Sequence, residues 1–316
     1  AKSEIVLFAD DTKIYNKITS PEDQQIIQEN IDNMVAWSHT WDLKFHPDKC
    51  KVMKIGNRGE NALFSYKIEG NIMKYTDEEC DLGLTIDNNL NFICHINNKV
   101  NKANKIMGLI RRSFTYLDGE TFSKLFKAFV WPHLEYASAT WDAKLKKTKD
   151  LIEKVQRRAT KLVPNCKDLN YKEKLKLLNL PCLAYRKIRG DLIETFKCIS
   201  GHYDEEIQDP VSSNIANNNR TRGHMYKLKS SATPHSKSNR RRFFTNRIVN
   251  CWNNLSEEVV SAPSTASFER RLDKYLDRYD TRFDYDRCLM FEDRLISGLG
   301  IINMIVNNVD NIDLDV

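Results

Sequence analysis

The stretch Ile5-Val6-Leu7-Phe8-Ala9-Asp10-Asp11 decides how the first part of the chain folds. Its run of apolar residues predicts a short buried strand, the two aspartates break the run, and Ile14 and Tyr15 resume the strand character. The pattern therefore predicts a hairpin whose turn carries two adjacent carboxylates. Such a pair can hold Mg²⁺, a hard cation that prefers oxygen ligands, but aspartate is also common in ordinary turns.

The remainder of residues 1–88 alternates short strands with one clear helix. The predicted elements are a helix that starts at Ser20-Pro21, a strand within 45–55, a hairpin over 66–75 with Gly70-Asn71 as its turn, and a strand at 82–86. Antiparallel hairpins with one covering helix are an α+β pattern.

After Asn91 the pattern changes to amphipathic helices. The first apolar stripe steps by three and four residues through Ile96, Val100, Ala103, Met107 and Ile110. Further helices are predicted from Asp118 to about Val130 with Pro132 closing it, from about Asp150, within 171–199, and at 239–254 and 264–279. We therefore divide the chain into an α+β part at 1–88, a mainly α-helical part at 89–200, a basic linker at 201–240, C-terminal helices at 241–280 and an unassigned tail at 281–316.

Charge is distributed unevenly along the chain. The 316 residues include 49 Lys and Arg against 43 Asp and Glu, a net charge of +6. Residues 1–90 hold 10 basic and 16 acidic side chains, whereas residues 91–200 hold 23 basic and 10 acidic ones. An acidic first part and a strongly basic middle favour carboxylate chemistry in the former and contact with a polyanion in the latter.

Composition excludes several classes of protein. No apolar run approaches the ~18 residues of a membrane-spanning helix, so we expect no membrane partner. The eight cysteines form no C-x-x-C pair, which argues against zinc ribbons and secreted disulfide scaffolds and favours an intracellular protein of the nucleus or cytoplasm. The first residues, Ala1-Lys2-Ser3-Glu4, lack a signal-peptide pattern and read as the start of a fragment of a longer chain.

An ordered series of motifs extends over roughly residues 4–275. It comprises Phe8-Ala9-Asp10-Asp11, Phe45-His46-Pro47-Asp48-Lys49-Cys50, Leu82-Gly83-Leu84-Thr85-Ile86-Asp87, Arg111-Arg112-Ser113-Phe114, Leu134-Glu135-Tyr136-Ala137, Val155-Gln156-Arg157-Arg158-Ala159-Thr160-Lys161, Arg189-Gly190-Asp191-Leu192 and Thr221-Arg222-Gly223-His224. In order and spacing, the series resembles the reverse transcriptases of non-LTR (LINE-type) retrotransposons, especially the jockey-like elements. The resemblance implies a partial palm at 1–88 followed by a helical thumb-like domain at 89–200.

The resemblance also implies roles for individual residues. Asp10 would bind Mg²⁺ with Asp11 as its neighbour, Lys49 would protonate the departing pyrophosphate, and Leu82 and Gly83 would lie near the primer terminus. The alternative for Lys49 is a solvated lysine on a strand, and the alternative for Gly83 is an ordinary glycine in a bulge. The implied partners are an RNA template and a DNA primer.

Departures from the family pattern limit the expected activity. The full site needs another aspartate from an earlier palm strand, and the fingers also lie upstream. His46, Asp81 and Trp131 replace the residues that are usual at their positions. We therefore predict a fragment of an RNA-directed DNA polymerase that is inactive alone, with Mg²⁺ expected only in the full-length parent. The alternatives are a non-catalytic nucleic-acid-binding remnant of a retrotransposon and a product without a selected role.

Basic side chains beside the helical stripes are the second candidate site. The predicted nucleic-acid contacts are Lys99, Lys102, Lys105, Arg111, Arg112, Arg157 and Arg158, together with Gly83. A solvated helix face is the alternative for all of these cations. Residues 220–247 combine arginines with Tyr226, Phe243 and Phe244, which either form a stacking surface for single strands or belong to the core.

Overall fold

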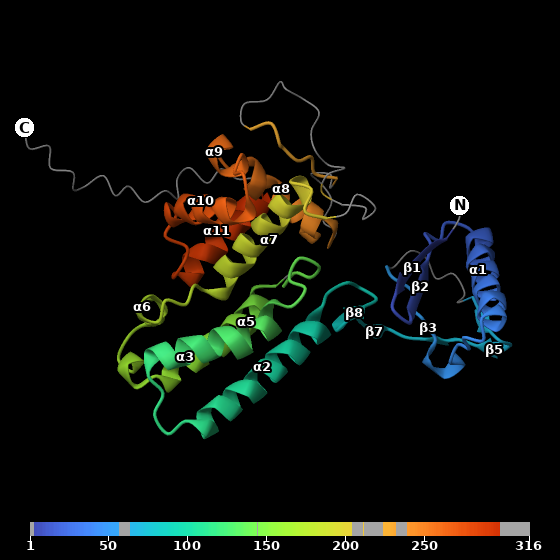
Figure 1. Cartoon of the computed structure of the whole chain (residues 1–316), viewed down its shortest axis with the longest axis horizontal. Helices are drawn as coiled ribbons and strands as arrows, with labels where there is room; N and C mark the ends of the chain where they lie inside the picture. The colour runs from blue at the N-terminus through green and yellow to red at the C-terminus, as the bar shows by residue number, and fades with distance from the viewer. Residues whose placement is uncertain are drawn as a thin grey trace, which may run out of the picture. The chain divides into compact units, whose positions relative to one another are not determined.

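Where the structure describes it, the first part of the chain contains four short two-stranded sheets and one long helix (Figure 1). The computed structural model describes residues 3–56, 64–143, 145–203, 211, 224–231 and 239–297, with the side chains of 239, 240, 296 and 297 left out. The chain divides into two compact units, residues 1–90 and 91–316. The first unit mixes strands and helix and the second is helical where described, so the fold class is α+β.

The predicted hairpin at the start of the chain is present. Strands β1 (Glu4–Phe8) and β2 (Asp11–Tyr15) pair antiparallel, with Phe8 opposite Asp11, so Ala9 and Asp10 form a two-residue turn. The predicted burial of the first strand is wrong, because every residue of β1 is exposed and Leu7 keeps 64% of its surface. An apolar run predicts a strand that can be covered, but it does not specify the element that covers it.

Helix α1 (Pro21–Thr40) packs against β2 and β4 (Lys67–Ile68). The helix begins as predicted: the Asp23 carboxylate accepts hydrogen bonds from the backbone N–H groups of Thr19, at 2.8 Å, and Ser20, at 2.9 Å. These bonds lower the pKa of Asp23 to about 2. The small core of this unit centres on Ile31, Tyr66 and Ile68.

The other strands of this unit are short. Strand β3 (Lys51–Val52) pairs in parallel with β6 (Lys74–Tyr75), β4 pairs with β5 (Asn71–Ile72), and β7 (Glu78–Asp81) pairs with β8 (Leu84–Asp87). The predicted 66–75 hairpin turns at Glu69-Gly70 rather than Gly70-Asn71, since both residues have positive φ, at 48° and 78°. The 82–86 strand is instead a hairpin, with Leu82-Gly83 as its turn.

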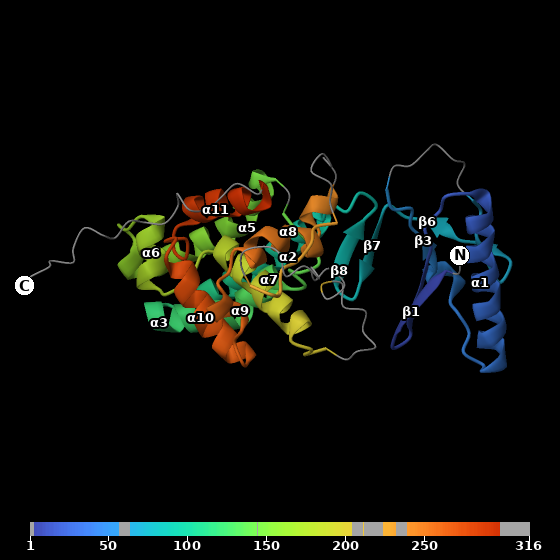
Figure 2. The same ribbon diagram turned by 90° about the horizontal axis from the view of Figure 1, so that it is seen from above.

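The second unit is built from helices. They are α2 (Ile93–Ser113), α3 (Gly119–Leu125), α4 (Trp131–Glu135), α5 (Lys146–Ala159), α6 (Tyr171–Leu177), α7 (Leu183–Ile199), α8 (Phe244–Asn253), α9 (Glu257–Val260), α10 (Thr265–Asp277) and α11 (Tyr285–Ser297). Helix α2 packs on α4 and α5, while α7 contacts α8, α10 and α11; α5 also contacts α7 and so joins the two groups (Figures 1 and 2). The residues of α2 that are buried include the whole predicted stripe from Ile96 to Ile110.

Pro132 does not close the second helix, contrary to the sequence prediction. A π-helical turn, Phe126–Val130, follows α3, and α4 continues from it with Pro132 near its start. Proline has no N–H and its ring clashes within a regular helix. The wider π-helical turn admits Pro132 near the start of a new segment, so the chain continues as helix.

Two segments without a predicted element belong to the helical core. In the segment 201–240, the indole N–H of Trp252 donates to the carbonyl of Tyr226 at 2.7 Å, and Leu228 is buried. In the tail, α11 packs against α7 and α8 and buries Cys288 and Phe291. Among the described residues, no helix has both the length and the hydropathy needed to cross a bilayer.

Candidate functional site

The paired carboxylates lie at the tip of the first hairpin. Asp10 is in the two-residue turn and Asp11 is the first residue of β2, and both are exposed. Ala9 has a φ of 51°, a left-handed conformation that lets the chain reverse within two residues. Within the described part of the chain, neither carboxylate accepts a side-chain hydrogen bond or forms an ion pair.

Two carboxylates do not complete a magnesium site. Mg²⁺ requires near-octahedral oxygen coordination and is usually held by carboxylates together with water and substrate phosphates. Among the described residues, no group of three or more His, Cys, Asp or Glu side chains could hold a metal ion. Asp10 and Asp11 are therefore candidates for only part of a coordination shell, and no catalytic step follows from them alone.

Lys49 does not lie on a strand. It ends a single 3₁₀ turn, Pro47–Lys49, in which its backbone N–H donates to the His46 carbonyl at 3.0 Å. Its side chain is exposed, and within the described residues it forms no hydrogen bond or ion pair with either hairpin carboxylate. The sequence alternation around Lys49 suggested a longer strand, but only Lys51–Val52 pairs with a neighbour.

Gly83 has a conformational reason for being glycine. Leu82 and Gly83 have φ angles of 46° and 79°, which is the left-handed pair that a type I′ hairpin turn requires. The residue before this turn, Asp81, forms an ion pair with Lys13 of β2 at 2.6 Å. The hairpin that carries Gly83 is thus connected to the hairpin that carries Asp10 and Asp11.

The basic residues of α2 do not share one face. With 3.6 residues per turn, Lys102, Lys105 and Arg112 lie within about 80° of one another around the helix axis and away from the buried stripe; all three are exposed. Lys99 flanks the stripe and lies over the Tyr136 ring at 4.5 Å. Arg111 is exposed on the opposite flank.

Arg157 and Arg158 of α5 have different surroundings. The Arg157 guanidinium lies 4.5 Å from the centre of the Tyr171 ring, a cation–π contact that ties α5 to α6. Arg158 is exposed and forms no ion pair within the described residues. Arg157 therefore has a packing role whether or not it also contacts a phosphate.

A buried ion-pair cluster, which sequence reasoning missed, lies inside the helical unit. The Arg247 guanidinium makes two bonds to Asp191, at 2.8 and 2.9 Å, and donates to the carbonyls of Ser138, Ala139 and Arg242. All three nitrogens of this guanidinium therefore donate hydrogen bonds within the fold. Among the basic residues between Pro210 and Ser256, Arg247 is structural and is not available to a ligand.

Lys187 extends the cluster. Its ammonium donates to the carbonyls of Ser138 and Trp141, at 2.8 and 3.0 Å, and lies 3.9 Å from Asp191. Burial lowers the pKa of Lys187, the neighbouring Arg247 lowers it further, and Asp191 opposes them. For Asp142, burial acts to raise the pKa, but the surrounding cations, Lys187 foremost, outweigh it and the pKa is lowered.

One signal for this cluster is present in the sequence. Asp191 falls between Ile188 and Leu192 on the apolar face of a predicted helix, and Arg247 directly precedes Ile248 and Val249. A lone charge on an apolar helix face is costly unless it is paired. The pattern therefore calls for a partner, although it does not say which one.

The predicted aromatic surface at 220–247 is divided. Phe243 keeps 38% of its surface, whereas Phe244 is half-buried with the Arg247 guanidinium 5.5 Å from its ring centre. His224 is buried, and its Nε2 lies 3.1 Å from the Trp252 carbonyl. The block Thr221-Arg222-Gly223 that precedes it falls outside the described residues.

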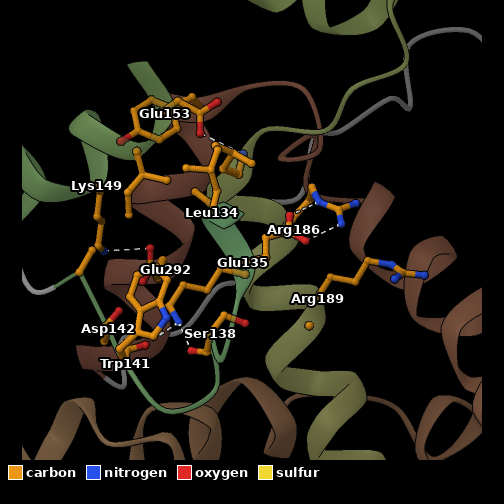
Figure 3. Close-up of a pocket in the computed structure, with 17 residues that line it drawn as sticks. Leu134, Glu135, Ser138, Trp141, Asp142, Lys149, Glu153, Arg186, Arg189 and Glu292 are labelled. Atoms are coloured by element: carbon orange, nitrogen blue, oxygen red, sulfur yellow. Dashed lines mark hydrogen bonds and ion pairs between the residues drawn. The ribbon is translucent and has the colours of Figure 1, made fainter. Parts of the chain in front are cut away.

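A cavity of about 230 Å³ lies beside the buried ion-pair cluster (Figure 3). Its wall is formed by the end of α4 and the loop after it, by α5, by α7 and by α11, and it includes Trp141, Asp142, Lys187 and Glu292. Glu153, also on the wall, is held between the Tyr171 hydroxyl at 2.5 Å and the Leu183 N–H at 2.9 Å. Burial, only partly offset by these bonds, raises the pKa of Glu153 to about 7.

Comparison with known proteins adds no relative. No protein-family model, no curated protein and no solved structure gives a significant match to this chain.

Proposed function

We propose that this chain is the carboxy-terminal part of an RNA-directed DNA polymerase of the non-LTR retrotransposon type, with a partial palm in the first unit and a thumb-like domain in the second. The observation that carries the proposal is the pair of adjacent exposed carboxylates at the tip of a two-residue hairpin turn. The ordered series of sequence motifs supports it. The exposed apolar side chains of β1 also support it, because a palm hairpin would have a further strand beside it.

The reaction of the intact parent would be nucleotidyl transfer. The primer 3′-hydroxyl attacks the α-phosphorus of a nucleoside triphosphate, and pyrophosphate leaves. Magnesium, when bound, would lower the pKa of the hydroxyl and stabilise charge on the leaving oxygens. Asp10 and Asp11 would supply two of its ligands, and Lys49 is the proposed proton donor to pyrophosphate. Since the described residues supply no third ligand, we propose that the chain is not catalytic alone.

A metal titration tests the role of the carboxylates. Mn²⁺, which replaces Mg²⁺ and broadens nearby NMR signals, is expected to broaden the amides of residues 9–12 at millimolar concentration. Asp10→Asn and Asp11→Asn should each abolish the effect. Asp77 is another exposed aspartate of this unit. If Asp77→Asn also abolishes the broadening at residues 9–12, the metal binds the surface generally and the proposal is contradicted.

A primer-extension assay tests the proposed lack of activity. Purified 1–316 with template, primer, nucleotides and Mg²⁺ is expected to incorporate no more nucleotide than its Asp10→Ala variant. Incorporation above that control would show that the chain supplies a complete site.

Nucleic-acid binding without catalysis is the second candidate function. The observation in its favour is the set of exposed cations Lys102, Lys105 and Arg112 on one side of α2. Each phosphate that a cation neutralises adds about 0.9 to the slope of log K against log salt for duplex DNA. A filter-binding titration should therefore show steep salt dependence, and replacing all three cations with Glu should flatten it.

A matched control is available in the first unit. Lys17, Lys44 and Lys74 are exposed, and replacing them with Glu makes the same change in net charge. The control should lower affinity much less than the α2 triple variant. A flat salt response of the unmodified chain, or equal losses in both variants, would eliminate a binding surface on α2.

A further inference from the structure

Asp142, on the wall of the cavity beside the buried ion-pair cluster, has one acceptor oxygen that nothing in the described structure satisfies. Asp142 keeps 7% of its surface and lines the cavity. Its Oδ2 accepts from Arg242 at 3.0 Å, while its Oδ1 is buried with no hydrogen-bond donor among the described residues. A buried carboxylate oxygen without a donor is costly. A molecule inside the cavity that offers an N–H or O–H group would remove this cost.

Most charged groups around the cavity have counter-ions, and Glu153, which forms no ion pair among the described residues, accepts hydrogen bonds from Tyr171 and Leu183 instead. Glu135 is paired with Arg186, Lys149 with Glu292 at 2.9 Å, and Arg189 with Asp273 at 2.6 Å. Lys187 donates to two carbonyls and faces Asp191. A charged ligand would therefore bring an uncompensated charge into a buried site, which is strongly unfavourable. The unsatisfied oxygen calls for a donor on an uncharged molecule.

Size and lining narrow the class of ligand further. A volume of about 230 Å³ is far more than one water needs, but it lies below the ~300–1,000 Å³ of pockets for drug-sized molecules. Apolar wall comes from Leu134, Trp141, Ile152 and Leu183. Figure 3 shows one side of the cavity with Trp141, Asp142 and Ser138 together, and another side with Leu134 and Glu153.

We propose that this cavity binds an uncharged, mostly apolar small molecule of fragment size that donates one hydrogen bond to Asp142 Oδ1. The site lies within the helical unit and does not depend on the proposed polymerase ancestry. Ligand binding here would join the loop after α4 to α5, α7 and α11, since all four contribute to the wall.

Three probes test the class of ligand on the full chain. Indole is uncharged and carries one N–H donor, benzofuran has nearly the same shape without the donor, and benzamidine is a cation. Calorimetric titration should show saturable binding of indole, at least tenfold weaker binding of benzofuran, because a hydrogen bond to a charged acceptor is lost, and no binding of benzamidine. Failure of indole to bind at millimolar concentration would mean that the cavity holds only water, and would overturn the proposal.

Two variants locate the site. Gly190 of α7 lines the cavity, and a side chain added there meets no atom within 4 Å of its Cβ. Gly190→Leu should fill the cavity and abolish indole binding. Gly108→Leu, at a glycine of α2 that is equally open and lies away from the cavity, should bind indole as the unmodified chain does. Indole binding that survives Gly190→Leu would place the site elsewhere.

Asp142→Asn tests the hydrogen bond itself. It should reduce indole affinity at least tenfold and leave the weak benzofuran affinity unchanged. Equal affinity of indole for the variant and for the unmodified chain would overturn the role of Asp142. If Asp142→Asn does not fold, as a thermal scan would show, the Gly190→Leu comparison and the three probes still decide the proposal.

Discussion

The Nζ atom of Lys13 lies 2.6 Å from Oδ1 of Asp81, and this ion pair joins the β1–β2 hairpin to the β7–β8 hairpin. The pair connects the strand that follows the Asp10-Asp11 turn with the strand that precedes the Leu82-Gly83 turn. An electrostatic contact thus links the segments that lead into and out of these two turns.

The Lys13–Asp81 ion pair should contribute little to stability and should depend on salt. Both side chains are about a third exposed, at 36% and 28%, and pairs in such surroundings contribute about 0.2–1 kcal/mol. A double-mutant cycle with Lys13→Ala and Asp81→Ala, measured by urea unfolding, should give a coupling energy in this range that falls at high salt. A coupling energy that is independent of salt would argue against a direct ion pair.

Leu82→Asn should stabilise the first unit. Leu82 is exposed and has a φ of 46°, a left-handed conformation that costs most L-residues roughly 1–2 kcal/mol. Asn-Gly is the preferred pair for a type I′ turn, so we expect a gain of about 1 kcal/mol in urea unfolding. Gly83→Ala at the neighbouring position, with a φ of 79°, should act in the opposite direction. No gain from Leu82→Asn would mean that this turn is not type I′ in solution.

Local elements of this fold follow from sequence where a single pattern determines them. The stripe from Ile96 to Ile110 predicts α2 and its buried face correctly, because 3.6-residue periodicity is a local property. The apolar positions of α11 were also present in the sequence, at Cys288, Phe291 and Leu295. Their spacing of three and four residues is a local signal of the same kind, although no element was predicted in this tail.

Long-range features could not be predicted in the same way. Arg247 and Asp191 are separated by 56 positions, and the pattern shows only that each needs a partner. The exposure of β1 depends on which strands lie beside it, which an apolar run does not state. Of the candidate site, the hairpin with Asp10 and Asp11 was predicted correctly. The strand predicted around Lys49 is wrong, because Lys49 lies in a 3₁₀ turn, and the cavity around Asp142 was not predicted.

Breaking the Asp191–Arg247 pair should be severely destabilising. The side chains keep only 9% and 5% of their surface, and removing one partner of a buried pair leaves an uncompensated charge at a cost of about 3–5 kcal/mol. Asp191→Asn keeps the shape and removes the charge, so it should lower the free energy of unfolding by an amount in this range. Glu120→Gln, which breaks the exposed Lys124–Glu120 pair, should leave the urea midpoint unchanged. Comparable losses of stability in both variants would show that burial of the Asp191–Arg247 pair is not the reason for its large contribution.

Glu153 should make stability fall as pH rises from about 4.5 to 7. Burial raises the pKa of this carboxyl from 4.5 to about 7, so over this interval the folded chain binds more protons than the unfolded chain. Stability then decreases with pH, and the contribution of Glu153 is fully present below the unfolded pKa and lost as pH passes the folded pKa. His95 acts in the opposite sense, because burial lowers its pKa from 6.5 to about 4 and favours the folded chain at higher pH.

Glu153→Gln isolates the carboxyl from His95 and the other titrating groups. The Gln amide can donate to the Tyr171 hydroxyl while its oxygen accepts from the Leu183 N–H, so the two bonds that Glu153 accepts are replaced. Relative to the variant, the unmodified chain should lose roughly 3 kcal/mol of unfolding free energy between pH 4.5 and 7. Above this interval the difference between the two proteins should stay constant. Urea unfolding at several pH values measures this difference. A constant difference across the whole interval would mean that Glu153 titrates normally and is therefore not buried in the folded protein.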